Sequence, residues 1–280
     1  MGFAVLGGSP ALLAGASRAD AQPGPLTPVR EYGQGVTPAF EGWYRNPDGT
    51  FSLSFGYYNR NSKESLEIPV GARNAISPGP ANQGQPGFFL PRRHWGVFAV
   101  TVPADFGTQK AVWTLIVESD TFAIPGSLKA GWEIDALAGE AGSGNTPPVL
   151  RFSPTGPGGS GPRGLTTGPV SATVGAPMTL TVWASDDGKA VGSIASAGRS
   201  GVPVTLTWFK HQGPVGDNVQ FADATPDIGR EDGRATTSVT FTQPGEYILR
   251  VRANDASGVE NAGHAQCCWS NGFVRVKVSP

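Results

Sequence analysis

The chain has 280 residues, a formal net charge of −1, 40 Gly and 25 Pro, and only 15% charged residues. Gly and Pro together are about twice as frequent as in an average globular protein. Because they destabilise a helix interior by about 1 and 3 kcal/mol, this composition excludes a largely helical protein. The 7 Trp, 14 Phe and 5 Tyr exclude a disordered chain, and without a basic excess we expect no nucleic-acid partner. The composition favours an all-β protein long enough for two domains.

The N-terminal segment is predicted to be a processing signal. Residues 3–16 are small and apolar, and Ala-Asp-Ala at 19–21 fits the small-x-small cleavage pattern, so Gln22 would be the first mature residue. Residues 1–21 thus resemble a secretory signal peptide, although no Lys or Arg precedes the apolar stretch, which leaves a start further upstream or a fragment as alternatives. We expect a secreted, periplasmic or cell-surface protein in an oxidising compartment, with no transmembrane segment.

Two stretches without apolar periodicity divide the rest of the chain. Residues 22–28 are rich in Pro, and residues 141–164 lie in a longer run of Gly, Pro and Ser, which is typical of linkers. We therefore expect domains at 29–140 and 165–280, with the first strand of the second domain starting near residue 146. The expected architecture is two β-sandwich domains joined by a Gly/Pro-rich linker.

The first domain is predicted to consist of antiparallel strands. Between residues 51 and 55, Phe and Leu alternate with Ser, which is the two-residue period of a half-buried strand. The Asn-Pro-Asp-Gly turn at 46–49 predicts a hairpin of residues 42–45 and 51–58. No segment has a helical apolar stripe, so we expect an antiparallel sandwich of no recognisable family. Further strands are expected at 66–70, 95–102 and 111–118.

The second domain has a clearer strand pattern. Seven short strands bounded by turn residues are typical of an immunoglobulin-like sandwich. The first is expected at 149–152 or at 170–174. The other six alternating segments lie at 178–184, 202–210, 219–222, 235–242, 246–254 and 272–279.

Three motifs in the second domain resemble PKD-type and bacterial immunoglobulin-like modules. They are Asn-Thr-Pro-Pro-Val at 145–149, Leu-Thr-Trp-Phe-Lys-His-Gln-Gly-Pro at 206–214, and Phe-Thr-Gln-Pro-Gly-Glu-Tyr-Ile-Leu-Arg-Val-Arg-Ala-Asn-Asp at 241–255. The resemblance implies that Trp208 fills the core between the sheets and that Tyr247 forms a tyrosine corner. The Asp-Gly pair that commonly follows the Trp of PKD modules is missing. The chain as a whole resembles uncharacterised secreted bacterial proteins.

The two cysteines of the chain, Cys267 and Cys268, are adjacent. Neighbouring Cα atoms lie about 3.8 Å apart, whereas ordinary disulfides prefer about 4.4–6.8 Å, so a bond between them would close a strained ring. An oxidising compartment favours this vicinal disulfide, either as a structural turn or, with Trp269 beside it, as a ligand platform. Two free thiols, or ligation of a soft metal together with His264, are the alternatives.

Acidic residues end two of the predicted strands, Asp186 and Asp187 the first and Asp255 the second. In immunoglobulin topology these strands run in the same direction, so the carboxylates should meet at one end of the sandwich, where the linker with Asn145 also arrives. Such a cluster can hold Ca²⁺, which takes roughly 6–8 oxygen ligands. Calcium is the possible exception to the expectation that the protein has no cofactor. The alternative is ordinary turn chemistry. A second acidic group lacks EF-hand spacing and is expected to be a solvated loop: Asp223, Asp227, Glu231 and Asp232.

A basic segment opens one strand of the first domain. Arg92, Arg93 and His94 are residue types that grip a carboxylate or a sugar hydroxyl, and Trp95 together with Tyr57 and Tyr58 offers stacking surfaces. The segment is therefore a candidate ligand-binding site. The alternative is a charged strand start on the surface.

Catalytic motifs are missing from the sequence, which has no nucleophile elbow, no zinc-protease motif and no P-loop. We expect a non-catalytic secreted or cell-surface protein for adhesion, scaffolding or protein interaction, with a protein or glycan at the cell surface as partner. The alternatives are a carbohydrate- or ligand-binding accessory module and a secreted hydrolase subunit. Exposed coplanar rings would favour the first alternative, and a pocket with two ionisable groups of shifted pKa the second. The oligomeric state is left open.

Overall fold

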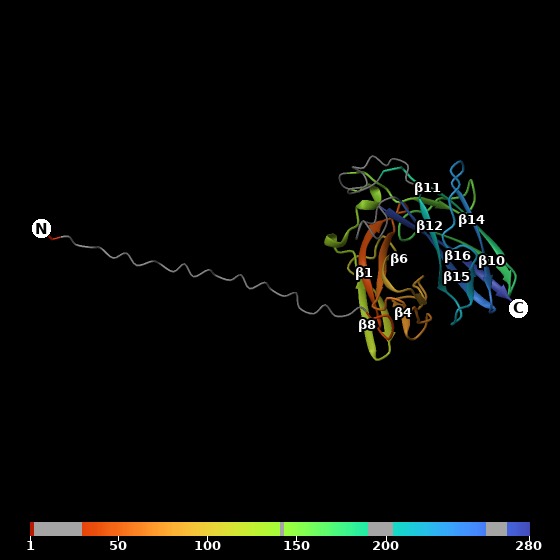
Figure 1. The fold of residues 1–280 in the computed structure, drawn as a ribbon, viewed down its shortest axis with the longest axis horizontal. Coiled ribbons are helices and arrows are strands. Elements are labelled where there is room, and N and C mark those ends of the chain that lie inside the picture. Colours follow the sequence, from red (N-terminus) through yellow and green to blue (C-terminus); the bar gives the residue numbers. More distant parts are fainter. Residues whose placement is uncertain (3–29, 141–142, 190–203, 256–267) are drawn as a thin grey trace.

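The computed structural model describes residues 1–2, 30–140, 143–189, 204–255 and 268–280. These residues form sixteen strands and two short 3₁₀ turns, grouped in two β-sandwiches that lie side by side (Figure 1). This confirms the predicted all-β architecture. The predicted signal peptide and the linker at 22–28 lie outside the described residues. In the described part of the chain, no helix is long and apolar enough to cross a membrane.

The N-terminal sandwich is built from two three-stranded sheets and a short two-stranded one. Its core is aromatic, because Phe55 stacks on Phe98 with centroids 5.5 Å apart and meets the edge of Trp113 at 6.0 Å. The first sheet has the order β1 (Val36–Arg45), β2 (Phe51–Asn59), β6 (Arg92–Val102); the second β4 (Asn74–Ser77), β7 (Ala111–Val117), β8 (Asp120–Gly126); the third pairs β3 (Leu66–Glu67) with β5 (Phe88–Phe89).

The predicted hairpin is confirmed as β1 and β2, which pair antiparallel with Trp43 opposite Leu53. The expected strand at 66–70 is shorter, since only β3 is extended there. Strands β4, β5 and β8 were missed by the sequence analysis. The first two are very short, and β8 carries Pro125, which weakens a strand prediction but is tolerated at the edge of a sheet, where β8 lies.

The C-terminal sandwich is immunoglobulin-like, with two four-stranded sheets. Trp208 is buried in its core, and Tyr247 donates a hydrogen bond from its hydroxyl to the Gln243 carbonyl at 2.8 Å, so the predicted tyrosine corner is confirmed. Both candidate first strands exist, one in each sheet. The sheets have the orders β13 (Val219–Phe221), β14 (Arg234–Phe241), β11 (Met178–Ser185), β9 (Val149–Arg151) and β10 (Leu165–Thr173), β16 (Trp269–Ser279), β15 (Gly245–Asn254), β12 (Thr205–Gln212).

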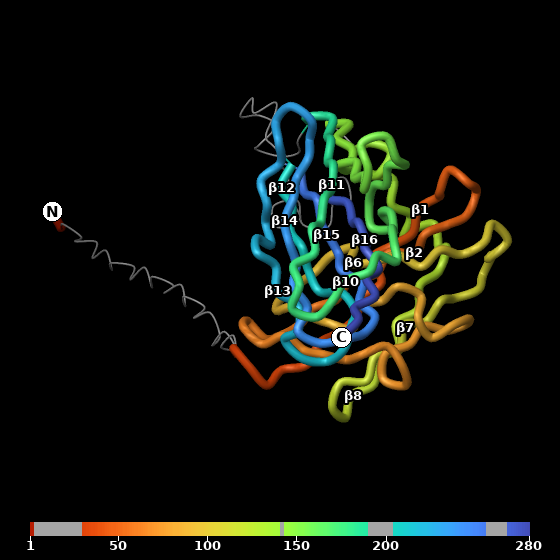
Figure 2. The backbone as a smooth tube through the Cα atoms, turned by 90° about the vertical axis from the view of Figure 1, so that its right-hand side faces the viewer, coloured from red at the N-terminus to blue at the C-terminus, as the bar shows by residue number. Residues whose placement is uncertain are grey.

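The two sandwiches pack directly on each other through the sheet that contains β15 and β16. Figure 2 shows the C-terminal strands running across the orange and yellow N-terminal strands. Phe273 of β16 belongs to the N-terminal core cluster. Asn271 of β16 donates hydrogen bonds from Nδ2 to the Gly96 carbonyl at 2.6 Å and to the Pro162 carbonyl at 3.0 Å. The contact between the sandwiches is therefore an ordered interface.

The Gly-rich segment before β10 is part of this interface. Gly164 has a φ of +54°, and a Cβ at this position would collide with the carbonyl of Asn271. The Arg163 amide donates to the Tyr44 hydroxyl at 2.8 Å. Glycine at 164 therefore serves a close approach of two backbones, which is a different use from the flexibility that the composition of a linker suggests.

Candidate functional site

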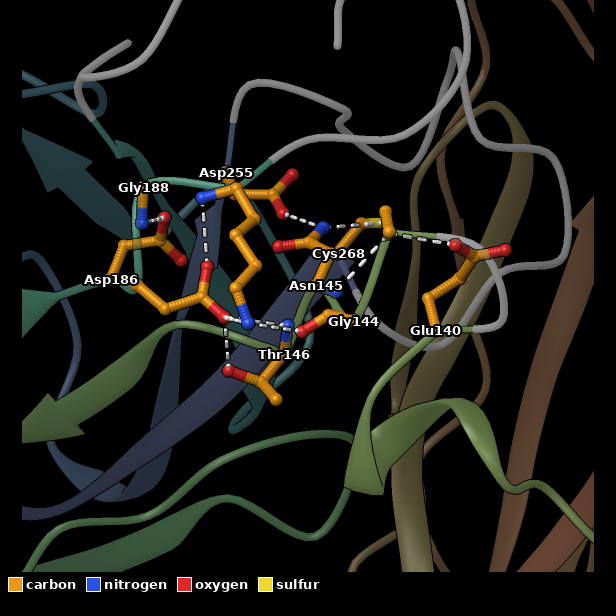
Figure 3. A network of polar contacts seen from close by, with 11 residues as sticks. Glu140, Gly144, Asn145, Thr146, Asp186, Gly188, Asp255 and Cys268 are labelled. Atoms are coloured by element: carbon orange, nitrogen blue, oxygen red, sulfur yellow. Dashed lines mark hydrogen bonds and ion pairs between the residues drawn. The ribbon is translucent and has the colours of Figure 1, made fainter.

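Asn145 ties the chain between the sandwiches to one end of the C-terminal sandwich. It is fully buried, and its Nδ2 donates a hydrogen bond to Oδ2 of Asp255 at 2.5 Å (Figure 3). Asp255 follows β15, and Asp186 follows β11 at the same end, because the two strands run in the same direction. The topology predicted from the sequence thus brings Asn145, Asp186 and Asp255 together.

The two neighbouring aspartates at this end have different surroundings. Partial burial, with the nearby charges of Asp255 and Asp187, raises the pKa of Asp186 to about 6. Its Oδ2 accepts from the Gly188 amide at 2.8 Å, and its buried Oδ1 has no hydrogen-bond partner among the described residues. For Asp187, burial acts to raise the pKa, but hydrogen bonds from Lys189 and Thr146 outweigh it and lower the pKa.

The network in Figure 3 brings carboxylate and amide side chains together, and their oxygens are the kind of ligand that Ca²⁺ prefers. A cation already takes part in it, since Nζ of Lys189 donates to the Gly144 carbonyl at 2.9 Å and lies 3.7 Å from Oδ2 of Asp187. Within the described ranges, no three His, Cys, Asp or Glu side chains converge in a metal-binding group. Oδ1 of Asp186 and Oδ1 of Asn145 are buried oxygens without a hydrogen-bond partner among the described residues. Calcium binding here stays a prediction.

The predicted vicinal disulfide cannot be placed in full, because Cys267 and His264 lie outside the described residues. Cys268 is fully buried next to the Asn145 network, with its Sγ 3.9 Å from Nδ2 of Asn145. Trp269 is also fully buried, and its ring lies against Gly96 of the N-terminal sandwich. The disulfide stays a prediction, and the ring of Trp269 serves the interface between the sandwiches.

The basic segment at the start of β6 is divided between the interior and the surface. Nη2 of Arg93 forms an ion pair with Oε1 of Glu41 at 2.6 Å, and the guanidinium lies 3.7 Å from the centroid of the Trp95 ring. Arg92 remains exposed, with a φ of +73° and its guanidinium 5.9 Å from the Tyr58 ring. Of the predicted ligand-binding residues, Arg92 and its neighbour Tyr58 therefore face outward together.

His94 points into the molecule. Its ring stacks on Tyr57 with centroids 5.0 Å apart, and its Nε2 lies 3.0 Å from the Pro91 carbonyl. Burial, reinforced by the charges of Arg250 and Arg252, lowers the pKa of His94 to about 3. The ring is therefore neutral at physiological pH and is committed to packing in this structure.

The second acidic group consists of exposed side chains with local hydrogen bonds. Oδ1 of Asp223 accepts from the Thr225 amide at 2.8 Å, and Oδ1 of Asp232 accepts from the Arg234 amide at 3.0 Å. Such bonds two residues along the chain are characteristic of Asx turns. They fit the solvated loop expected from the sequence.

Arg250 and His211 are buried residues that the sequence analysis did not single out. Nη1 of Arg250 donates to the Val97 carbonyl at 3.2 Å, and burial lowers its pKa to about 9. Burial also lowers the pKa of His211 to about 3, and its Nε2 lies 2.8 Å from the Gly84 carbonyl. Alternation along β15 places Arg250 on the face opposite the core, where a polar residue is ordinarily taken to be exposed.

The comparisons with known proteins leave the family open. No family model matches the chain. Similar solved structures include the Yersinia pseudotuberculosis adhesin InvE (15% identity over 86% of this chain and 58% of that chain, TM-score 0.25) and the D00-D0 domain of intimin (11% over 86% and 98%, 0.26). Domains 4 and 5 of the S-layer protein SbsC are similar at 11% identity over 89% and 100%, with a TM-score of 0.23. This chain spans 58% of the InvE chain. The immunoglobulin-like character of the C-terminal sandwich follows from its strand order.

Proposed function

We propose that this chain is a non-catalytic secreted or cell-surface protein that acts in adhesion, scaffolding or protein interaction. The observation that supports this proposal is the ordered interface between the sandwiches, in which Asn271 and Phe273 of β16 are buried against the N-terminal sandwich. A pair of sandwiches fixed in this way presents a surface of constant shape, which lowers the entropy lost when a partner binds.

The placement of the aromatic rings also supports a role in protein interaction over a carbohydrate-binding module. Trp43, Trp113 and Trp208 are buried. Among the described residues the exposed rings are scattered, since Tyr32 is 60% exposed before β1, Tyr58 is 38% exposed on β2 and Trp132 is 51% exposed in a 3₁₀ turn. Aromatic residues here contribute chiefly to packing, whereas a sugar-binding face needs rings aligned on one surface.

The strongly shifted titratable groups fit structural roles. His94, His211 and Arg250 owe their pKa shifts first to burial. Each has a ring or guanidinium nitrogen within hydrogen-bond distance of a backbone carbonyl across the interface or in a neighbouring loop. These contacts engage the side chains in holding backbone segments together, which favours a scaffold over a hydrolase subunit.

The proposal can be tested in two steps. The full chain, expressed with its own N-terminus in a bacterium, should be found outside the cytoplasm, with Gln22 as its first residue by N-terminal sequencing. Retention in the cytoplasm would overturn the localisation. Beads coated with the purified chain should then attach to intact cells or to cell-surface protein more than beads coated with heat-unfolded chain. Equal attachment of both would overturn adhesion, and selective capture of purified glycans would favour the accessory module.

A further inference from the structure

A cleft of about 500 Å³ lies between the two sandwiches. The N-terminal sandwich contributes Glu67 of β3 and Phe88 of β5 to its walls, and the C-terminal sandwich contributes Trp208 and Lys210 of β12 together with Phe221 of β13. Its volume is in the range of pockets that bind small molecules. Because both sandwiches form its walls, the cleft depends on the interface between them.

The rings in this cleft already hold cations of the protein. Nζ of Lys210 lies 5.4 Å from the centroid of the Phe88 ring. The guanidinium of Arg250 lies 4.7 Å from the ring of Phe209, a further lining residue. Phe221 stacks on Trp208 with centroids 6.3 Å apart and an interplanar angle of 27°, and among the described residues no cation lies over this pair. The rings of Phe88 and Phe209 therefore already make cation–π contacts within the protein. The described residues make no such contact with the stacked rings of Phe221 and Trp208.

The lining also holds four polar side chains, those of Ser65, Glu67, Lys210 and Asp217. Nζ of Lys210 donates to the Pro214 carbonyl at 2.7 Å and to the Gly216 carbonyl at 2.8 Å, and it lies 3.6 Å from Oε1 of Glu67. The ammonium group of Lys210 is therefore engaged by two hydrogen bonds and one ion pair within the protein. The carboxylate of Glu67 is occupied, because the Gly216 amide donates to its Oε1 at 3.1 Å and to its Oε2 at 2.9 Å in addition to the ion pair with Lys210. The carboxylate of Asp217, which is exposed at the rim, is open to a ligand. With one Lys against two carboxylates, the lining carries a formal charge of −1.

A ligand that fits this lining must donate hydrogen bonds, carry positive charge and bury an apolar body. We propose that the cleft binds a small organic ammonium ion with an aromatic or aliphatic body, whose charged group contacts Asp217 and whose body packs on Phe221. The net negative charge of the lining and the carboxylate of Asp217 disfavour an acid. A neutral molecule of the same shape lacks both the charge pairing and the cation–π attraction.

The test uses phenethylamine as the probe and two compounds of the same shape as comparisons. Phenylacetate replaces the ammonium group with a carboxylate, and 2-phenylethanol replaces it with a hydroxyl. Binding to the full chain, followed by NMR titration at neutral pH, should give a roughly millimolar Kd for the amine. The alcohol and the acid should bind about tenfold more weakly or less. Equal binding of the alcohol, or no binding of the amine, would overturn the proposal.

Two exposed carboxylates give a matched pair of variants. Asp217→Asn should weaken binding of the amine about fivefold and leave binding of the alcohol unchanged, because it removes charge and keeps shape. Asp105→Asn, in the exposed turn after β6, should change neither. Unchanged melting temperatures would show that both variants fold. An equal effect of the two substitutions would mean that long-range charge alone is responsible and would overturn a site at Asp217.

Discussion

The two faces of the sheet that contains β15 are buried in different ways. On the inner face, Leu249 and Val251 pack into the apolar core of the C-terminal sandwich. On the outer face, Ile248 and Arg250 turn toward the N-terminal sandwich, where polar side chains bond to backbone carbonyls. Burial on the inner face gains free energy simply by removing apolar surface from water. On the outer face each polar group must find a partner, so that face specifies how the sandwiches dock.

The largest expected effect is a loss of unfolding free energy in acid, which we expect from two buried histidines, His94 and His211. The unfolded chain takes up protons at His94 and His211 near pH 6.5, whereas burial holds both pKa values at about 3 in the folded chain. Stability is therefore fully present above pH 6.5 and is lost as the pH falls toward 3. Between pH 6.5 and 5 we expect a loss of about 2 kcal/mol for each histidine.

The variant His211→Gln tests this pH dependence. Gln keeps an N–H donor for the Gly84 carbonyl but does not titrate, so the slope of unfolding free energy against pH should fall by about half. Urea unfolding at several pH values measures the slope. An unchanged slope would show that His211 can be protonated in the folded state.

A cavity on the inner face is expected to have the next largest effect. Leu249 is fully buried, so Leu249→Ala should reduce the free energy of unfolding by about 2–5 kcal/mol. The control is Val215→Ala at a 60% exposed site, where no comparable loss is expected. Chemical denaturation measures both, and similar midpoints for the two variants would contradict a close-packed inner face.

On the outer face, Asn271→Ala should cost about 1–3 kcal/mol, because buried carbonyls of Gly96 and Pro162 lose their donor. The matched control is Asn82→Ala, whose side chain contacts Gln212 in an exposed setting and should cost only a few tenths of a kcal/mol. Both are read from denaturant midpoints. If the two losses are alike, the outer face does not specify docking through Asn271.

The sequence predicted the inner face and missed the outer one for a physical reason. Alternation of Tyr, Leu and Val with other residues along β15 identifies one face as core, and tyrosine-corner geometry follows from Tyr247. The same alternation leaves Arg250 on a face that is exposed in a lone sandwich. Only the position of the N-terminal sandwich makes it buried, and alternation within one strand carries no information about a contact between distant segments.

The candidate site also has some features that the sequence predicts and others that depend on contacts between distant segments. Strand direction alone was enough to bring Asp186 and Asp255 to one end with Asn145. By contrast, the division of the basic segment into a paired Arg93 and an exposed Arg92 depends on Glu41, which lies on a different strand. Topology can be derived from the order of strands, whereas the choice of an ion-pair partner depends on side-chain packing.

Calcium gives a smaller expected effect, away from the interface. If Asp186 and Asn145 supply ligands, Ca²⁺ at about ten times its Kd should raise the melting temperature by about 2–4 °C. Asp186→Asn should abolish this rise, and Asp223→Asn, in the exposed acidic loop, should keep it. Thermal unfolding with millimolar Ca²⁺ and with a chelator measures the difference. No shift in the wild-type chain would show the calcium prediction to be wrong.

The smallest expected effect is that of Arg250→Met, and it is the most informative about the outer face. Keeping the Arg250 side chain charged costs free energy, because it is buried and its Nε has no hydrogen-bond partner among the residues described. Burial accordingly lowers its pKa to about 9. Arg250→Met keeps most of the volume and removes this charge, so the unfolding free energy should stay within about 1 kcal/mol of the wild type or increase. Arg250→Ala should instead cost about 2–4 kcal/mol, because it leaves a cavity over Phe209. A large loss of unfolding free energy for both variants would mean that the charge itself stabilises the interface. Tolerance of Met but not of Ala would show that the outer face requires the shape of this side chain more than its charge.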